Sequence, residues 1–214
     1  MADINPTLVK TLREKTNAGM MDCKRALTEA GGDLEKAEAI LRQKGIASAG
    51  KKASRAAKEG IVASYIHLQG KVGVLVEINC ETDFVAKNDN FRDLVKDITL
   101  QIAAAHPLVV SRDQVDATLI SKEREIYKAQ VQGKPEAIVE KIVDGKLDKF
   151  YSTICLLEQA SIKNPDLTIK DLIATKMSEL GENIVIRRFV RYSVGEEAGA
   201  EGAQGEGTEE EVAA

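Results

Sequence analysis

The sequence is poor in the residue types on which many enzymes and extracellular proteins depend. It has no tryptophan, only two histidines and three cysteines, and aromatic residues make up 4% of the chain. The cysteines, Cys23, Cys80 and Cys155, are odd in number and form no CxxC pair, which argues against a disulfide framework or a zinc site. We therefore expect three reduced thiols and no metal or other cofactor.

Long apolar runs are also missing. No stretch approaches the roughly 20 apolar residues that a membrane-spanning helix needs. Residues 1–6 lack the basic and apolar regions of a signal peptide. We therefore expect a cytoplasmic protein that does not enter a membrane.

The acidic residues are unevenly distributed along the chain. The formal net charge is −4, yet residues 195–214 hold seven glutamates and no lysine or arginine. Without this tail, 30 basic residues face 27 acidic ones, so residues 1–194 carry a charge of about +3. This balance gives no reason to expect direct nucleic-acid binding. The tail is rich in Gly, Ala and Glu, and we expect it to be disordered.

No familiar active-site motif is present. The chain lacks the GxxxxGK[ST] phosphate-binding loop, the GxSxG elbow, the HExxH zinc motif and a kinase signature. Cys80 is a conceivable nucleophile, but the neighbouring carboxylates of Glu81 and Asp83 should raise its pKa and suppress the reactive thiolate. We therefore predict that the protein is not an enzyme.

Residues 1–46 have the pattern of a bundle of three short helices. Asn5 followed by Pro6 is a helix start signal, and Asp33 is a good cap for a third helix, which we expect Gly45 to end. The breaks between the helices fall at residues 17–19 and 31–32. The pattern predicts a small separate domain.

Residues 47–60 are rich in Ala, Lys and Gly, and we interpret them as a linker, either irregular or helical. Its basic residues are Lys51, Lys52, Arg55 and Lys58. Such a cluster either contacts RNA or lies on a solvated face, and the latter is the commoner case.

Residues 61–194 predict an α+β domain, in which helices cover a small antiparallel sheet. The expected elements are a β-hairpin at residues 61–68 and 72–80, a helix that Pro107 ends, a helical hairpin at 116–157, a helix at 168–181 and a last strand at 184–194. Thr168 and Asp171 have the spacing of a capping box at the start of the last helix.

Phe84 lies in a polar segment between an apolar strand and an amphipathic helix. A phenylalanine left in water costs about 1.5–3 kcal/mol relative to a buried one. The ring therefore either folds back onto its own core or serves as an aromatic anchor for a partner. Met20, which follows Gly19 at a helix entrance, poses the same choice between core and contact.

Three motifs in the chain resemble those of a known family. The first consists of LREKT at residues 12–16 followed by AGMMDCKRAL at 18–27. The second is NCETDFVAKN at 79–88, and the third is GENIVIRR at 181–188. In this order they resemble the elongation factor Ts family, and the resemblance spans residues 3–194. It implies a ubiquitin-associated-like first domain and a short form with one core half.

The resemblance also implies a role in protein biosynthesis. Members of the family are guanine-nucleotide exchange factors for the GTPase elongation factor Tu. In the family, the turn matching Asp83 and Phe84 wedges into the GTPase near its Mg²⁺ and phosphate site. The residues that match partner-contact positions are Leu12, Met20, His67, Thr82, Asp83, Phe84, Val85, Leu180 and Gly181.

Two further expectations concern partners. A short form with one core half leaves sheet edges or apolar helix faces that a second copy would cover, so we expect a homodimer. The alternative function is an adaptor that binds RNA or a ubiquitin-like protein through the three-helix domain and the basic linker.

Overall fold

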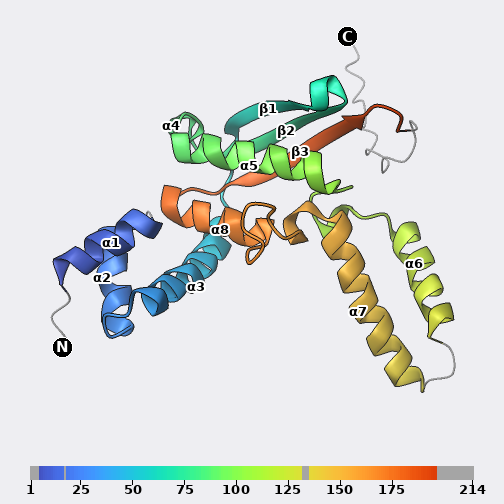
Figure 1. Cartoon of the computed structure of the whole chain (residues 1–214), viewed down its shortest axis with the longest axis horizontal. Coiled ribbons are helices and arrows are strands. Elements are labelled where there is room, and N and C mark those ends of the chain that lie inside the picture. Colours follow the sequence, from blue (N-terminus) through green and yellow to red (C-terminus); the bar gives the residue numbers. More distant parts are fainter. Residues whose placement is uncertain (1–4, 17, 132–134, 197–214) are drawn as a thin grey trace, which may run out of the picture.

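The computed structural model describes residues 5–16, 18–131 and 135–196. The elements are α1 (Pro6–Thr16), α2 (Met20–Glu29), α3 (Leu34–Lys52), β1 (Glu59–His67), η1 (Leu68–Gly70), β2 (Val72–Cys80), α4 (Asp83–Ala86), α5 (Asp89–Ala105), η2 (Arg112–Gln114), α6 (Ala117–Gln130), α7 (Glu136–Ile154), η3 (Leu156–Glu158), α8 (Ile169–Leu180) and β3 (Val185–Ser193). Figure 1 shows their arrangement. The tail predicted to be disordered lies outside the described residues from position 197 onward. Within the described ranges, no helix combines the length and apolar character that crossing a membrane requires.

The three strands form one antiparallel sheet in the order β1-β2-β3. Strand β2 is central, and alternate residues along it from Val72 to Cys80 are buried. Helix α5 packs against β1 and β2, and α8 packs against α5 and α3 (Figure 1). The predicted α+β class, an antiparallel sheet covered by helices, is confirmed.

Helices α1, α2 and α3 enclose a small core of their own. Its buried members are Val9, Leu12, Cys23, Ala26, Leu27 and Ala37. The start signals act as predicted, because the side chain of Asn5 accepts a hydrogen bond from the Thr7 amide and that of Asp33 accepts one from the Lys36 amide. The main core under the sheet is a second, separate cluster.

The expected end of α3 at Gly45 is wrong, because the helix continues to Lys52. The residues after Gly45 include alanine and lysine, which favour helix, and α3 packs along α8 in this region. A Cβ atom at Gly45 would lie 3.4 Å from the Cβ of Ser178, so glycine allows a close approach of the two helices. The proposed domain boundary at residue 46 thus falls inside a continuous helix. The division into domains itself stays a prediction.

Helices α6 and α7 form the expected hairpin, which extends away from the sheet (Figure 1). Arg124 on α6 pairs with Glu140 and Asp144 on α7 at 2.8 and 2.7 Å. Residues 132–134, between the two helices of this hairpin, lie outside the described part of the chain. The two ion pairs of Arg124 join α6 to α7.

Helix α8 begins and ends as predicted. Thr168 and Asp171 form the capping box, and Gly181 ends the helix in the left-handed conformation with φ of 80°. The helix therefore stops abruptly, and the chain turns into the loop before β3.

Gly60 should be the glycine whose replacement harms the sheet most. Its φ is +146°, and an added Cβ would lie 2.2 Å from the carbonyl oxygen of Ile78 on the paired strand. We expect Gly60→Ala to lower the free energy of unfolding by about 1–3 kcal/mol. Gly50→Ala is the matched control, because nothing lies within 4 Å of its added Cβ and alanine favours helix α3. Urea unfolding that ranks both variants equally would contradict the strain assigned to Gly60.

Candidate partner-binding surface

A short polar turn connects β2 to α5 and contains helix α4. Thr82 caps α4, and its hydroxyl oxygen accepts a hydrogen bond from the Val85 amide at 3.4 Å. Val85 is partly buried against the main core, and Ala86 is buried within it. These two residues take the inward positions of α4, so Phe84 is left on its outer side.

Phe84 is 81% exposed, the largest exposed fraction of any large apolar side chain in the described ranges. Of the two alternatives that the sequence left open, packing of this ring onto its own core is therefore wrong. The turn holds an aromatic ring in water, at a cost of about 1.5–3 kcal/mol relative to burial. This cost would be recovered if a partner covered the ring.

Asp83 lies next to this ring and carries a negative charge at neutral pH. Its carboxylate pairs with the Lys87 ammonium group at 2.7 Å, and this hydrogen bond is the main cause that lowers the pKa of Asp83 below its usual value. Both groups are exposed at the surface. The turn thus presents an aromatic ring beside a charged pair.

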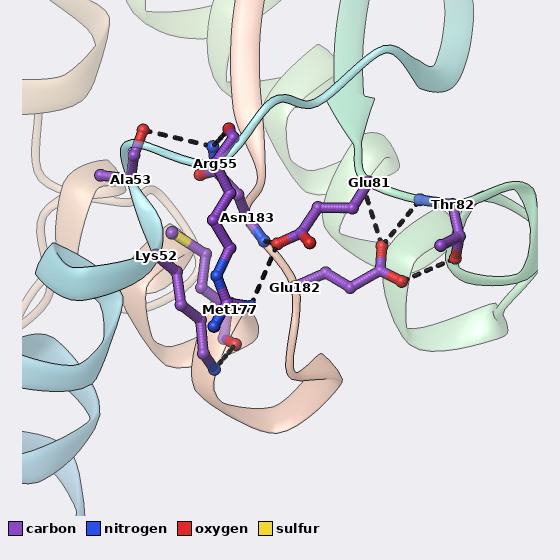
Figure 2. Close-up of polar contacts among 8 residues, drawn as sticks. All are labelled: Lys52, Ala53, Arg55, Glu81, Thr82, Met177, Glu182 and Asn183. Carbon is purple, nitrogen blue, oxygen red and sulfur yellow. Dashed lines mark hydrogen bonds and ion pairs between the residues drawn. The ribbon is translucent and has the colours of Figure 1, made fainter.

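The loop between α8 and β3 supports the turn from beneath (Figure 2). One carboxylate oxygen of Glu182 accepts hydrogen bonds from the amides of Glu81 and Thr82, each at 3.0 Å. The other oxygen accepts one from the Thr82 hydroxyl at 2.6 Å. In return, the Asn183 amide donates to the Glu81 carboxylate at 2.6 Å. Glu182 was not predicted as a site residue. The one feature of the sequence that could have pointed to it is its place in the third motif.

Asn183 also ties this loop to the chain that leaves α3 (Figure 2). Its side-chain amide donates to the carbonyl oxygens of Ala53 and Arg55 at 3.3 and 2.7 Å. Lys52 donates to the Met177 carbonyl at 2.9 Å, and Arg55 lies 3.5 Å from the Glu81 carboxylate. Two of the four basic residues of the predicted linker therefore make internal contacts, which weakens the alternative of an RNA-binding cluster.

Other residues singled out from the sequence lie in different places. Met20 is the first residue of α2 and is 59% exposed, so it is available for contact. Leu12 is fully buried in the core of the three helices, so the direct partner contact expected of it is not available in this conformation. Its apolar side chain supports the helix that carries it.

Leu180 and Gly181 lie directly before Glu182, and this brings them next to the turn. Leu180 is partly buried against the main core, and Gly181 is exposed. His67 lies at the opposite end of the β-hairpin, because it pairs with Val72, the first residue of β2. Its ring stacks on Tyr65 with centroids 5.6 Å apart. The predicted site residues thus form one cluster at the turn, two separate exposed positions at Met20 and His67, and one buried position at Leu12.

Cys80 has the properties of a packing residue. It is buried at the end of β2, and burial followed by the charge of Glu182 raises its pKa to about 11. The expected direction is correct, although burial is the larger cause and the main carboxylate is Glu182. Cys80 pairs with Glu59 at one end of the hairpin, and His67 lies at the other end. Cys80 and His67 therefore do not form a nucleophile and base. In the described ranges, no group of three or more His, Cys, Asp or Glu residues is placed to hold a metal ion.

Comparison with known proteins assigns the chain to a family. A family model described as Elongation factor TS matches residues 46–196. Proteins named Elongation factor Ts from Carboxydothermus hydrogenoformans and Desulforamulus reducens are 60% and 59% identical to the chain. These alignments cover 90% and 92% of this chain, and 90% and 91% of the two relatives.

A third relative with the same name, from Thermodesulfovibrio yellowstonii, is 58% identical over 90% of the chain and 97% of its own length. The resemblance carried by the three motifs is confirmed. The chain belongs to the elongation factor Ts family.

Proposed function

We propose that this protein is a guanine-nucleotide exchange factor of translation elongation, which makes the GTPase elongation factor Tu release GDP and is not itself an enzyme. Family membership supports this role. The single structural observation that carries it is Phe84, which is 81% exposed on a turn anchored at both ends. An exposed aromatic ring on an anchored turn is suited to insertion into a partner, where it would be a source of binding energy.

The proposed mechanism requires no chemistry on this chain. A GTPase holds GDP through backbone amides around the phosphates and through Mg²⁺. The factor binds the nucleotide-free GTPase more tightly than the GDP-bound GTPase. By linkage, the bound factor lowers the affinity of the GTPase for GDP as much as bound GDP lowers its affinity for the factor. A ~10⁴-fold loss of nucleotide affinity needs about 5.5 kcal/mol of differential contact.

The turn supplies a substantial part of this energy. Burial of the Phe84 ring contributes about 1.5–3 kcal/mol. In the proposal the ring enters the GTPase near its Mg²⁺ and phosphate site, where it disturbs the geometry that holds GDP. Thr82 and Asp83 precede the ring on the same turn, and Leu180 with Gly181 extends the surface beside the turn. GTP then binds and displaces the factor.

Met20 provides a second contact in the proposal. It is exposed on the three-helix unit, away from the turn, so it adds to affinity and takes no part in displacing GDP. His67 would join the contact only if the partner reached the far end of the hairpin.

A homodimer is also part of the proposal, through the outer face of the sheet. Val62, Ile66, Leu75 and Tyr192 are 63%, 65%, 47% and 67% exposed. The strand register places them on one face, because Ile66 and Tyr192 both pair with Gly73, two residues from Leu75. An apolar sheet face of this kind favours cover by a second copy.

The direct test is release of fluorescent GDP from elongation factor Tu. The whole chain should accelerate release, and Phe84→Ala should reduce the maximal rate by one to two orders of magnitude, since about 1.4 kcal/mol of lost transition-state contact costs tenfold. Because the ring is exposed, this variant should change the free energy of unfolding by less than about 0.5 kcal/mol.

Phe91→Ala is the matched control for stability, because Phe91 is fully buried and its truncation should cost about 3–5 kcal/mol. A chain that leaves GDP release unchanged, but binds RNA in a salt-sensitive way, would support the adaptor instead. Normal release by the Phe84→Ala variant would remove Phe84 from the mechanism.

Met20→Ser should separate affinity from the release step. Loss of about 1–1.4 kcal/mol of apolar contact should weaken binding to elongation factor Tu about fivefold to tenfold. The release rate at saturating factor should stay within twofold of the parent. Titration of the release rate against factor concentration measures both quantities. Unchanged affinity would show that Met20 is not a contact.

Leu75→Lys should dissociate the homodimer by placing a charge on the outer face of the sheet. The parent should sediment as a dimer of the 23.2 kDa chain at micromolar concentration, and the variant as a monomer. Leu108→Lys is the control, because Leu108 has a similar exposure of 48% and lies outside the sheet. A monomeric parent would contradict the proposed interface.

A further inference from the structure

Helix α4 is too short to hold Phe84 in place by itself. It has four residues, whereas an isolated helix needs many more to be stable in water. Contacts from outside α4 must therefore hold the turn. Val85 and Ala86 anchor its later part in the main core. The earlier part, Glu81 and Thr82, is exposed or half-exposed and has no such apolar anchor.

Glu182 provides the anchor for this earlier part. The ladder between β1 and β2 ends at the pair Glu59 and Cys80, so the next two amides of the chain leave the sheet. The Glu182 carboxylate accepts hydrogen bonds from both amides and from the Thr82 hydroxyl (Figure 2).

The loop that carries Glu182 is itself fixed on both sides. Gly181 ends α8 in a left-handed conformation, and its amide donates to the Met177 carbonyl. Asn183 is 2% exposed, donates its side-chain amide to two carbonyl groups of the chain after α3, and donates its backbone amide to Glu81. The bonds of the Gly181 amide and of the Asn183 side chain are made outside the turn, so the backbone that carries Glu182 is fixed independently of the turn, and little backbone freedom is lost when the carboxylate binds the turn.

We infer that Glu182 is a positioning residue for Phe84, which holds the entry to α4 so that the ring projects in one direction. This inference rests on the exchange function proposed above. Without Glu182, the turn keeps its anchors at Val85 and Ala86, and the Glu81 carboxylate keeps its bond to the Asn183 amide, but the backbone amides of Glu81 and Thr82 and the Thr82 hydroxyl lose their acceptor. The ring then samples more orientations, and ordering it in the partner slows the release step. Initial binding through Met20 is unaffected.

A double-mutant cycle tests whether Glu182 acts through Phe84. Glu182→Ala should lower the maximal GDP release rate from elongation factor Tu about tenfold, with at most a twofold change in the concentration for half-maximal rate. In a Phe84→Ala background, Glu182→Ala should lower the rate less than twofold further, since the residue through which it acts is already gone. Full additivity of the two losses, or no loss with Glu182→Ala alone, would overturn the inference.

Glu182→Gln separates hydrogen bonding from charge. Its amide oxygen accepts from the two backbone amides and its NH₂ group donates to the Thr82 hydroxyl, so the rate should stay within about threefold of the parent. A loss as large as that of Glu182→Ala would contradict a role through these bonds. Glu158→Ala is the control, because Glu158 pairs with Arg112 elsewhere in the fold and should leave the rate unchanged.

A second measurement needs no GTPase and separates this inference from the proposed function. Hydrogen exchange of the Glu81 and Thr82 amides, followed by NMR in the whole chain, should accelerate at least tenfold with Glu182→Ala and stay unchanged with Glu158→Ala. Unchanged hydrogen exchange at both amides would refute the positioning role of Glu182 even if the chain accelerates GDP release. Accelerated hydrogen exchange in a chain that does not accelerate GDP release would show that the proposed function is wrong and that Glu182 does hold the turn.

Discussion

The antiparallel pairing of β2 with β3 determines both the core and the position of the turn that carries Phe84. Strand β2 is hydrogen-bonded on both sides and buried on one face. Because the pairing is antiparallel, the end of β2 lies beside the start of β3, with Asn79 opposite Val185. This register brings Glu182 beneath Glu81 and Thr82, about 100 residues away in the sequence. The same register thus builds the core and supports the turn that carries Phe84.

The two faces of the sheet have different chemistry. The inner face packs on α5, and its side chains from β2 are buried. The outer face keeps exposed apolar side chains on all three strands. Phe84 lies beyond the end of β2 and belongs to neither face. A second copy on the outer face and a GTPase at the turn would therefore use different surfaces of one small fold.

Most of the fold follows from local patterns in the sequence. The capping box at Thr168 and the helix end at Gly181 each depend on a few neighbouring residues, and both are as expected. The end of α3 was missed because a glycine inside a helix is unfavourable in isolation. Its close contact with Ser178 on α8 is a tertiary feature that the pattern does not contain.

The site was predictable in part. The motif around Phe84 marked the turn, but apolar character alone does not say whether a ring packs inward, because Val85 and Ala86 compete for the same core positions. Leu12 was expected to contact the partner because it lies in the first motif. Its side chain is instead buried in the core of the three helices. Glu182 was missed since its partners are set by strand pairing and not by neighbours in the chain.

In the proposed mechanism, a preformed turn carries Phe84 into the partner. A structure of the whole chain bound to nucleotide-free elongation factor Tu would test this. We expect the Phe84 ring to be buried in the GTPase, while the hydrogen bonds from Glu81 and Thr82 to Glu182 are the same as in the free chain. A complex in which Phe84 stays in solvent, or in which the turn refolds and leaves Glu182, would contradict it.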